Sequence, residues 1–336
     1  MEKPIAVVTI NWNGADNTLR CLAALRASER VAWHLYVVDN ASTDGSGDRL
    51  ERELSGDGRG GGSDATLIRS PINGGWTGGN NRGIERALAA GHELIFILNN
   101  DAFVRPDTLA VLVETLARES HGGDAALPVL GPIHQGAGSA SYDFRVSHRE
   151  PKTGIPVWTR PADQGPETRQ PTYPTAYVSG AGMLIHRHHF EAVGLLDDRF
   201  YLNFDDTDWC ARAEQAGFPL LMVRDAVIDH LGSASIGGVM SPLQTYFMTR
   251  NRLLYAEKHG SVRDRLRLLR RQIWKARELA PGSAWRMLLP QGDPVAFAFR
   301  RGLIDYIARR FGDCPDSIRA VQARPRPPRP AAPRAG

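Results

Sequence analysis

Short apolar runs that alternate with helical patterns constrain the fold of this chain more than any other feature. Such runs, rich in β-branched and aliphatic residues, are typical of buried strands, and strands separated by helices build a parallel or mixed sheet. The sequence therefore predicts an α/β fold over about residues 1–130. The predicted strands are 4–10 (PIAVVTI), 34–38 (HLYVV), 65–69 (ATLIR) and 93–98 (ELIFIL), with helices at 17–27 and up to residue 90.

The pattern is less regular after residue 130. Residues 131–174 are rich in Gly, Pro and polar side chains, which predicts a long excursion over the sheet. Further strands are predicted at 177–185, 219–223 and 226–229.

Polar residues follow several of the predicted strands, where open α/β sheets bind ligands. Asp39 is suited to accept a hydrogen bond from a base or a ribose. Asp101, with Asn99 and Asn100, offers oxygen atoms that suit Mg²⁺ or Mn²⁺, although one carboxylate needs a diphosphate and another protein ligand to hold the ion. His230 can serve as a neutral imidazole ligand, but a lone histidine is more often structural.

Two glycine-rich stretches differ in their context. Residues 73–83 (NGGWTGGNNRG) lead into a helix, so their amides can approach a phosphate, although a tight turn explains the glycines equally well. By contrast, the G-x-G-x-x-G at 56–61 follows a helix and precedes a strand, the wrong order for a dinucleotide fingerprint. This order excludes an NAD-dependent dehydrogenase. Small residues at 179–182 would let a substrate approach the backbone.

The stretch 200–218 (FYLNFDDTDWCARAEQAGF) places Asp205, Asp206 and Asp208 at the start of a predicted helix, with Gly217 at its end. A helix N-terminus favours ionised carboxylates and fixes their direction, so one of them can act as a general base in a cleft. Acids that merely cap the helix are the alternative.

Seven motifs, in order and spacing, resemble the family 2 glycosyltransferases of GT-A fold, most of all their rhamnosyltransferase-like branch. The resemblance covers residues 4–259 and implies a Rossmann-like mixed sheet flanked by helices, which performs inverting, metal-dependent transfer from a nucleotide-diphospho-sugar. It implies a catalytic domain at 1–259, divided into a nucleotide-binding part (1–130) and an acceptor-binding part (131–259). The motifs are VVTINWNG, VVDNASTDGS, NGGWTGGNNRGI, LNNDAFV, SGAGMLIHR, NFDDTDWCARAEQAGF and H-x-G-S.

The resemblance also assigns site residues. Asp206 matches the catalytic base, and Asp205 replaces a glutamate of the family pattern, which leaves open which carboxylate reaches the acceptor. The implied metal ligands are Asp101, Asn99 and His230, for Mg²⁺ or Mn²⁺. Donor-binding residues are Asn11, Asp39, Asn40, Ser42, Trp76, Asn80, Asn81 and Asn100; acceptor-side residues are Gly180, Ala181, Gly182, Arg250 and Asn251.

Basic charge is concentrated in the C-terminal region. The net charge is +4, yet residues 261–336 hold 17 Lys and Arg against 6 Asp and Glu, and residues 1–260 hold 24 against 31. Stripes of apolar residues among arginines at 262–274 and 296–311 predict basic amphipathic helices in an extension at 260–318, followed by a disordered Pro/Arg-rich tail at 319–336. These helices suit an anionic membrane surface, and packing on the protein itself is nearly as favoured.

Several further expectations concern partners and location. Without a run of eighteen apolar residues or a signal layout, we expect a cytoplasmic protein at the inner face of the cell membrane. The expected partners are a nucleotide-sugar donor and a glycan or polyprenyl-linked acceptor in cell-surface polysaccharide synthesis, without nucleic acid. The preferred donor is dTDP-rhamnose, as the branch resemblance implies.

Three other functions are the alternatives to this interpretation. A UDP-sugar transferase acting on a small natural product stays open. A non-catalytic sugar-nucleotide-binding protein would explain Asn at 99 and 100, but binding alone needs no base such as Asp206. A nucleotidyltransferase would require a glycine-rich, Lys-containing loop near the N-terminus, and the sequence has none there.

Overall fold

The computed structural model describes residues 3–55, 64–120, 127–136, 146–150, 156–159, 170–232, 241–279 and 293–323. The glycines at 56–61 and the last thirteen residues therefore lie outside the described part.

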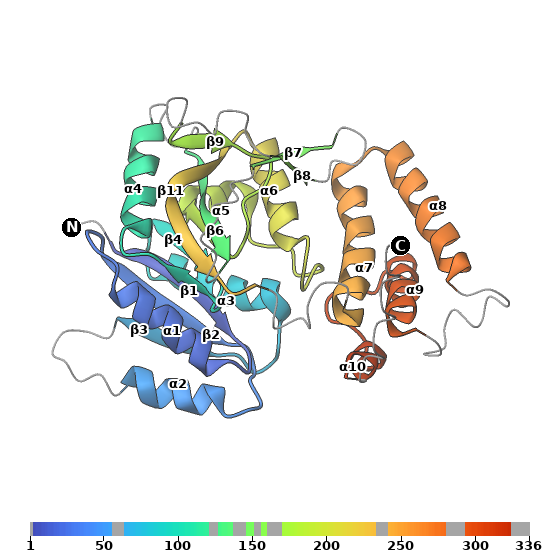
Figure 1. Cartoon of the computed structure of the whole chain (residues 1–336), viewed down its shortest axis with the longest axis horizontal. Coiled ribbons are helices and arrows are strands. Elements are labelled where there is room, and N and C mark those ends of the chain that lie inside the picture. The colour runs from blue at the N-terminus through green and yellow to red at the C-terminus, as the bar shows by residue number, and fades with distance from the viewer. Residues whose placement is uncertain are drawn as a thin grey trace, which may run out of the picture.

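In Figure 1 a sheet flanked by helices forms one side of the molecule, and four C-terminal helices form the other. The strands are β1 (Ile5–Asn11), β2 (Trp33–Asp39), β3 (Ala65–Arg69), β4 (Leu94–Leu98), β5 (Ala102–Val104), β6 (Val129–Gly136), β7 (Val146–Arg149), β8 (Pro156–Thr159), β9 (Thr172–Pro174), β10 (Gly182–His186) and β11 (Leu220–His230). The helices are α1 (Ala15–Arg26), α2 (Ser46–Ser55), α3 (Gly75–Ala89), α4 (Thr108–Glu119), α5 (Arg187–Val193), α6 (Asp205–Gln215), α7 (Pro242–His259), α8 (Val262–Glu278), α9 (Pro294–Ile307) and α10 (Asp316–Gln322).

The main sheet is mixed, with strand order β3-β2-β1-β4-β10-β6-β11-β5 and β9 paired to β11. Strands β3, β2, β1 and β4 are parallel, as the alternation of strands and helices predicts. Antiparallel β10 joins this half to β6 and β11, so strands from before and after residue 130 share one continuous sheet. The predicted mixed α/β fold with flanking helices is confirmed.

Alternation along the buried strands divides the core into two layers, because successive side chains of a strand point to opposite faces. Ile5 and Val7 pack on one face, with residues of α1 and α4, and Ala6 and Val8 pack on the other, with residues of α3 and α6. The central stretches of β1, β2 and β4 are largely apolar because helices cover both faces of the sheet.

Three local predictions are wrong. Residues 131–136 were predicted to lie in a long excursion over the sheet, but they belong to β6, which runs to Gly136 inside the main sheet. The predicted strand 177–185 is shorter, because residues 177–181 form a loop before β10. Finally, the two strands predicted at 219–229 are one strand, β11, whose pairing register with β6 shifts between Val223 and Val227.

The C-terminal helices form a compact unit. Ser241 and Ser261 cap α7 and α8 through their side chains, and Asp293 caps α9. The apolar stripe of α9 packs inward, with Phe299 and Leu303 buried against α7 and α8. Helix α10 continues to Gln322, so the first residues of the predicted disordered tail are helical. None of the helices in the described ranges is long and apolar enough to span a membrane.

Candidate active site

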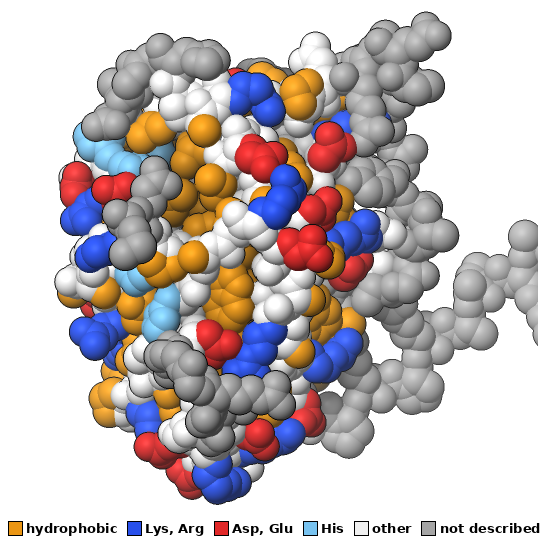
Figure 2. All heavy atoms as spheres, turned by 90° about the vertical axis from the view of Figure 1, so that its left-hand side faces the viewer, with side chains coloured by type: hydrophobic (Ala, Val, Ile, Leu, Met, Phe, Trp, Pro, Cys, Tyr) orange, Lys and Arg blue, Asp and Glu red, His pale blue; other side chains and the backbone are white. Residues whose placement is uncertain are grey.

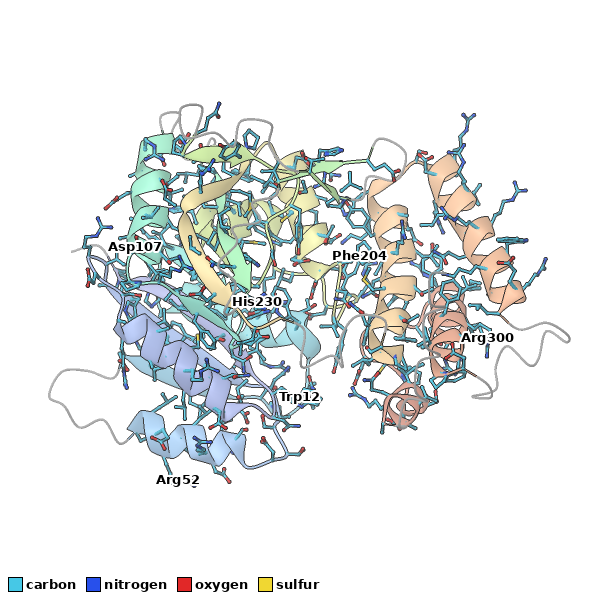
Figure 3. All side chains as sticks on the ribbon, viewed as in Figure 1. Trp12, Arg52, Asp107, Phe204, His230 and Arg300 are labelled. Atoms are coloured by element: carbon cyan, nitrogen blue, oxygen red, sulfur yellow. The ribbon has the colours of Figure 1, made fainter. Side chains whose placement is uncertain are left out.

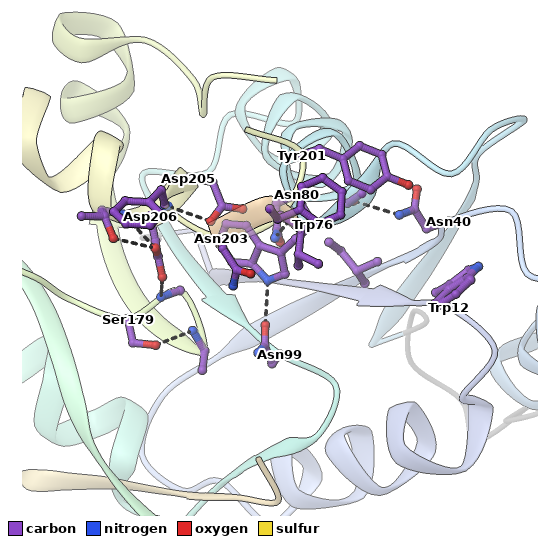
Figure 4. Close-up of a pocket in the computed structure, with 18 of the residues that line it drawn as sticks. Trp12, Asn40, Trp76, Asn80, Asn99, Ser179, Tyr201, Asn203, Asp205 and Asp206 are labelled. Carbon is purple, nitrogen blue, oxygen red and sulfur yellow. Dashed lines mark hydrogen bonds between the residues drawn. The ribbon is translucent and has the colours of Figure 1, made fainter. Parts of the chain in front are cut away.

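A cavity of about 530 Å³ opens where the sheet meets the N-terminal ends of α3 and α6. Its wall contains the residues that follow β1, β2 and β4, the loop 177–181 and the loop 201–204. Leu243, Phe247 and Met248 of α7 also line the cavity, as does Arg319 of α10. Strand ends and the C-terminal helices therefore meet at one site, shown in Figure 4.

Asp205 and Asp206 begin α6 and line this cavity. Oδ2 of Asp206 accepts hydrogen bonds from the Tyr177 hydroxyl at 2.6 Å and from the Gly180 amide at 3.1 Å. Asp205 is buried, and its Oδ2 accepts a hydrogen bond from the Thr77 hydroxyl at 3.1 Å.

Burial raises the pKa of Asp205 to about 8, and the charge of Asp206 adds to this shift. Burial also raises the pKa of Asp206, whereas the bond from Tyr177 lowers it. Of the two acids, Asp206 is the more accessible.

The loop before α6 has an unusual backbone. Tyr201, Asn203 and Phe204 have positive φ angles of 64°, 66° and 68°. Non-glycine residues rarely adopt this region. Each such residue costs ~1–3 kcal/mol of conformational free energy and persists only where the surrounding structure holds it. The loop also approaches the start of α3 closely. The approach leaves no room for a side chain at Gly75, since a Cβ atom there would collide with Tyr201. Its shape sets where α6, and so Asp206, begins.

Arg250 and Asn251 of α7 hold this loop, which corrects their predicted place on the acceptor side. Both side chains are fully buried and do not line the cavity. The Asn251 amide donates to the carbonyls of Phe200, Leu202 and Asn203 at 2.8, 2.8 and 2.9 Å. The Arg250 guanidinium donates to the carbonyl of Phe200 at 3.1 Å. These two residues stabilise the strained backbone from behind.

Three predicted donor-binding residues form a hydrogen-bonded group behind the cavity wall. The Asn11 amide donates to Asp39 Oδ1 at 2.9 Å and to the Ser42 hydroxyl at 3.0 Å. Asn11 and Asp39 are buried at the paired ends of β1 and β2, and their neighbours Trp12 and Asn40 line the cavity instead. In this structure, therefore, these three side chains shape the strand ends without reaching the cavity.

The asparagines of α3 also separate into two kinds. Asn80 lines the cavity, and its amide donates to the carbonyl of Trp76. Asn81 does not line it: its amide donates to Leu196 O and to Asp198 Oδ1, both at 2.9 Å. In this structure Asn81 therefore holds the segment around Leu196, and its place beside a diphosphate stays a prediction. The glycine-rich stretch is itself helical from Gly75 onward, a start earlier than predicted.

Trp76 connects α3 to the end of β4. Its indole N–H donates to Asn99 Oδ1 at 2.8 Å, as Figure 4 shows, so one of the two lone pairs of that oxygen is already used. The ring lies against Gly180, where any side chain would collide with it. Ala181 also lines the cavity, whereas Gly182 packs against Ile228 and Pro132 inside the sheet.

Asp101 and His230 come together although they are far apart in sequence. His230 ends β11, as Figure 3 shows, and pairs with Ala102 of β5. Its Nε2 lies 3.2 Å from Asp101 Oδ1, and both residues line the cavity. Asn100, also in the wall, donates to the Thr18 hydroxyl. Within the described ranges no third His, Cys, Asp or Glu joins the pair.

The third acid of the motif, Asp208, faces away from the cavity. It is fully buried and accepts contacts from Arg212 at 2.9 Å, Lys258 at 2.6 Å and His259 at 2.8 Å. Lys258 and His259 end α7, so Asp208 ties α6 to the C-terminal helices. Its role in this structure is to connect two parts of the fold.

Sequence reasoning missed three residues of this site. Thr77 and Tyr177 contact the two acids, and Tyr201 lies in the cavity wall. Thr77 lay within a quoted motif and Tyr177 two residues before another, but nothing in their local pattern indicated a carboxylate partner more than twenty residues away.

The chain is similar to known proteins over most of its length. Residues 6–194 match the family model described as glycosyl transferase family 2. The chain is 27% identical over 269 residues to the low-salt glycan biosynthesis hexosyltransferase Agl10 of Haloferax volcanii, covering 76% of each chain. It is 23% identical to the dTDP-rhamnosyl transferase RfbF of Shigella flexneri, covering 53% of this chain and 58% of that one. Galactofuranosyltransferase GlfT1 of Mycobacterium tuberculosis is 26% identical over 93% of this chain and 96% of its own.

Solved structures show the same fold. The mannosyltransferase PcManGT from Pyrobaculum calidifontis, in complex with GDP-Man and Mn²⁺, superposes with a TM-score of 0.53 at 16% identity, over 92% of this chain and 87% of its own. GalNAc-T7, solved with UDP, GalNAc and Mn²⁺, gives a TM-score of 0.55 at 13% identity, over 84% of this chain and 59% of its own.

Proposed function

Because the chain belongs to glycosyl transferase family 2, we propose that it transfers a sugar, with inversion, from a nucleotide-diphosphate donor to a hydroxyl group of a glycan acceptor. The observation that carries this proposal is the arrangement of Asp206 and the Asp101–His230 pair in the wall of one cavity. A base for the acceptor and a site for the leaving group are the two parts that such a reaction needs.

In this reaction the acceptor oxygen bonds to the anomeric carbon of the sugar while the bond from that carbon to the diphosphate breaks. Asp206 takes the proton of the acceptor hydroxyl. Asp205 is the more deeply buried of the two acids, and burial together with the charge of Asp206 raises its pKa to about 8. Asp206 is therefore the acid of the pair that we assign as the base.

The leaving diphosphate would be served by Mg²⁺ or Mn²⁺. An imidazole nitrogen and a carboxylate oxygen 3.2 Å apart can turn toward one divalent ion. The carboxylate oxygen suits both metals, whereas the imidazole nitrogen is a softer ligand and favours Mn²⁺ over Mg²⁺. Such an ion would neutralise the charge that develops on the diphosphate. Two protein ligands leave its other positions to donor phosphates and water. Asp101 and His230 are the residues we assign.

The donor we propose is dTDP-rhamnose, with a glycan or polyprenyl-linked acceptor in polysaccharide synthesis. The similarity to a dTDP-rhamnosyl transferase supports this donor. A UDP-sugar is the alternative to test beside it. Cavity residues such as Trp12, Asn40 and Asn80 would contact the nucleotide.

A donor screen tests the function. Purified protein should release nucleoside diphosphate from one of dTDP-rhamnose, UDP-sugars or GDP-sugars, in the presence of candidate acceptors. Release should stop with EDTA and return with Mn²⁺ or Mg²⁺, and Asp101→Asn should weaken it. Asp229→Asn is the matched control, because Asp229 neighbours His230 but pairs with Arg105 instead. Full activity in EDTA would contradict the metal assignment, and binding of none of the donors would contradict the function.

We also propose that α8 contacts an anionic membrane surface. Its outer face combines Val262, Leu266 and Trp274, which are 73%, 53% and 63% exposed, with exposed arginines. In Figure 1 it lies at the outer edge of the helical part, and on the opposite end of the molecule, seen in Figure 2, basic and acidic side chains are mixed. Helix α9 contributes less, because Phe299 and Leu303 of its stripe are buried.

Vesicle flotation checks the membrane contact. Each basic residue near an anionic surface contributes ~1 kcal/mol, so Arg270→Gln with Arg271→Gln should weaken binding to phosphatidylglycerol vesicles roughly 30-fold. The control is Arg52→Gln with Arg118→Gln, which removes the same charge from α2 and α4 and should bind like the wild type. Equal loss in both double variants would contradict a role of α8.

A further inference from the structure

The carboxylate of Asp206 is surrounded by hydrogen-bond donors. Oδ2 accepts from the Tyr177 hydroxyl at 2.6 Å and from the Gly180 amide at 3.1 Å. Oδ1 accepts from the Thr207 amide at 2.7 Å and from the Thr207 hydroxyl at 3.3 Å. An ionised carboxylate has about four lone-pair positions, so these four donors fill them. An acceptor hydroxyl can approach this base only if one of them gives way.

The four donors differ in strength and in freedom to move. The two amides are fixed by the backbone. The Tyr177 bond is the shortest of the four, and O–H···O⁻ bonds of this length are strong. The Thr207 hydroxyl bond is the longest, comes from the side chain next in the sequence, and can rotate away. Oδ1 is therefore the oxygen that can open toward a substrate, while Tyr177 keeps hold of Oδ2.

We propose that Tyr177 is a positioning residue that fixes Oδ2 of Asp206 and keeps the carboxylate ionised, so that Oδ1 takes the acceptor proton when the Thr207 hydroxyl turns away. This inference rests on the proposed function. In the transfer step the acceptor O–H bond breaks, its proton moves to Oδ1, the acceptor oxygen bonds to the anomeric carbon, and the diphosphate leaves with the electrons of its C–O bond.

The ionisable groups around Asp206 are consistent with this arrangement. Tyr177 stays a hydroxyl donor, because burial raises its pKa well above the ordinary value and the charge of Asp206 adds to the shift. Cys210, one turn further along α6, stays a thiol, since burial raises its pKa to about 12. Asp205 also titrates over an assay range. A hydrogen bond to the charged form of an acid favours that form, so loss of the Tyr177 hydroxyl makes Asp206 harder to ionise.

The test is the pH profile of kcat/KM for Tyr177→Phe, measured with the donor and acceptor that the wild type uses. The acid limb should move to higher pH, with kcat/KM about tenfold or more below wild type on the acid side and most of the loss recovered at alkaline pH, as expected for a charge-assisted hydrogen bond. The KM for the donor should stay the same. A purely structural role would lower the rate equally at all pH values.

The matched control is Tyr173→Phe. Tyr173 is also buried, but its hydroxyl bonds with Gln170 and Arg224 and not with a carboxylate of the site. Its profile should keep the wild-type shape. Donor binding by calorimetry shows whether each variant is folded. If folded Tyr177→Phe keeps the acid limb of the wild type, this inference is wrong and the proposed function is unaffected. If the wild type itself transfers no sugar, the proposed function is wrong.

Discussion

Replacing Asp206 with asparagine should lower kcat by ~10²–10⁴, the usual contribution of a general base, while the affinity for the donor stays close to that of the wild type. The amide keeps the size of the side chain and can accept hydrogen bonds from Tyr177 and Gly180, but it cannot take a proton. Steady-state kinetics with the donor identified by the screen, together with calorimetric donor binding, measure the two quantities.

Asp205→Asn is the informative comparison for this prediction. The oxygens of Asp205 accept bonds from Thr77 and from the Asp206 amide, and Asp205 is the more deeply buried of the two acids, with a pKa that burial raises to about 8. Its loss should therefore reduce kcat less than the loss of Asp206 does. If Asp205→Asn were the more damaging change, the roles of the two acids would have to be exchanged.

Replacing Asp208 with asparagine should destabilise the fold by ~3 kcal/mol, because it removes a fully buried carboxylate on which the partly buried Arg212 and Lys258 converge. Lys258 and His259 contact Asp208 from α7, and Arg212 contacts it from α6. Denaturant unfolding followed by circular dichroism measures the change. Asp16→Asn, which removes an acid that is 82% exposed and pairs with Arg49, is the control and should change stability by less than about 0.5 kcal/mol.

The same carboxylate predicts how stability depends on pH. Burial alone would raise the pKa of Asp208, but the bond from His259 and the charges of Lys258 and Arg212 outweigh it, and the net shift is downward. An acid whose pKa is lower in the folded state stabilises the protein above its unfolded pKa. This contribution should disappear as the pH falls from about 3.8 through the lower folded value, and Asp208→Asn should lack that part of the acid transition.

Local patterns in the sequence were sufficient for the fold and for the main chemical groups. The strands β1 to β4 and the start of α6 follow from apolar runs and from acids at a helix N-terminus, which are properties of neighbouring residues. The same kind of pattern placed Asp206, Asp101 and His230 at strand ends or a helix start, and all three line the cavity.

Only the tertiary structure decided which polar side chains remain open to a substrate. Asn81 and Asn251 have residue types that suit ligand binding, yet the fold uses both to satisfy buried carbonyl groups. The partner of Asn251 is a loop about fifty residues earlier, and its strained backbone cannot be read from a sequence pattern. Because a buried backbone carbonyl must find a donor, and the donor can come from any distant element, that choice is made only when the chain has folded.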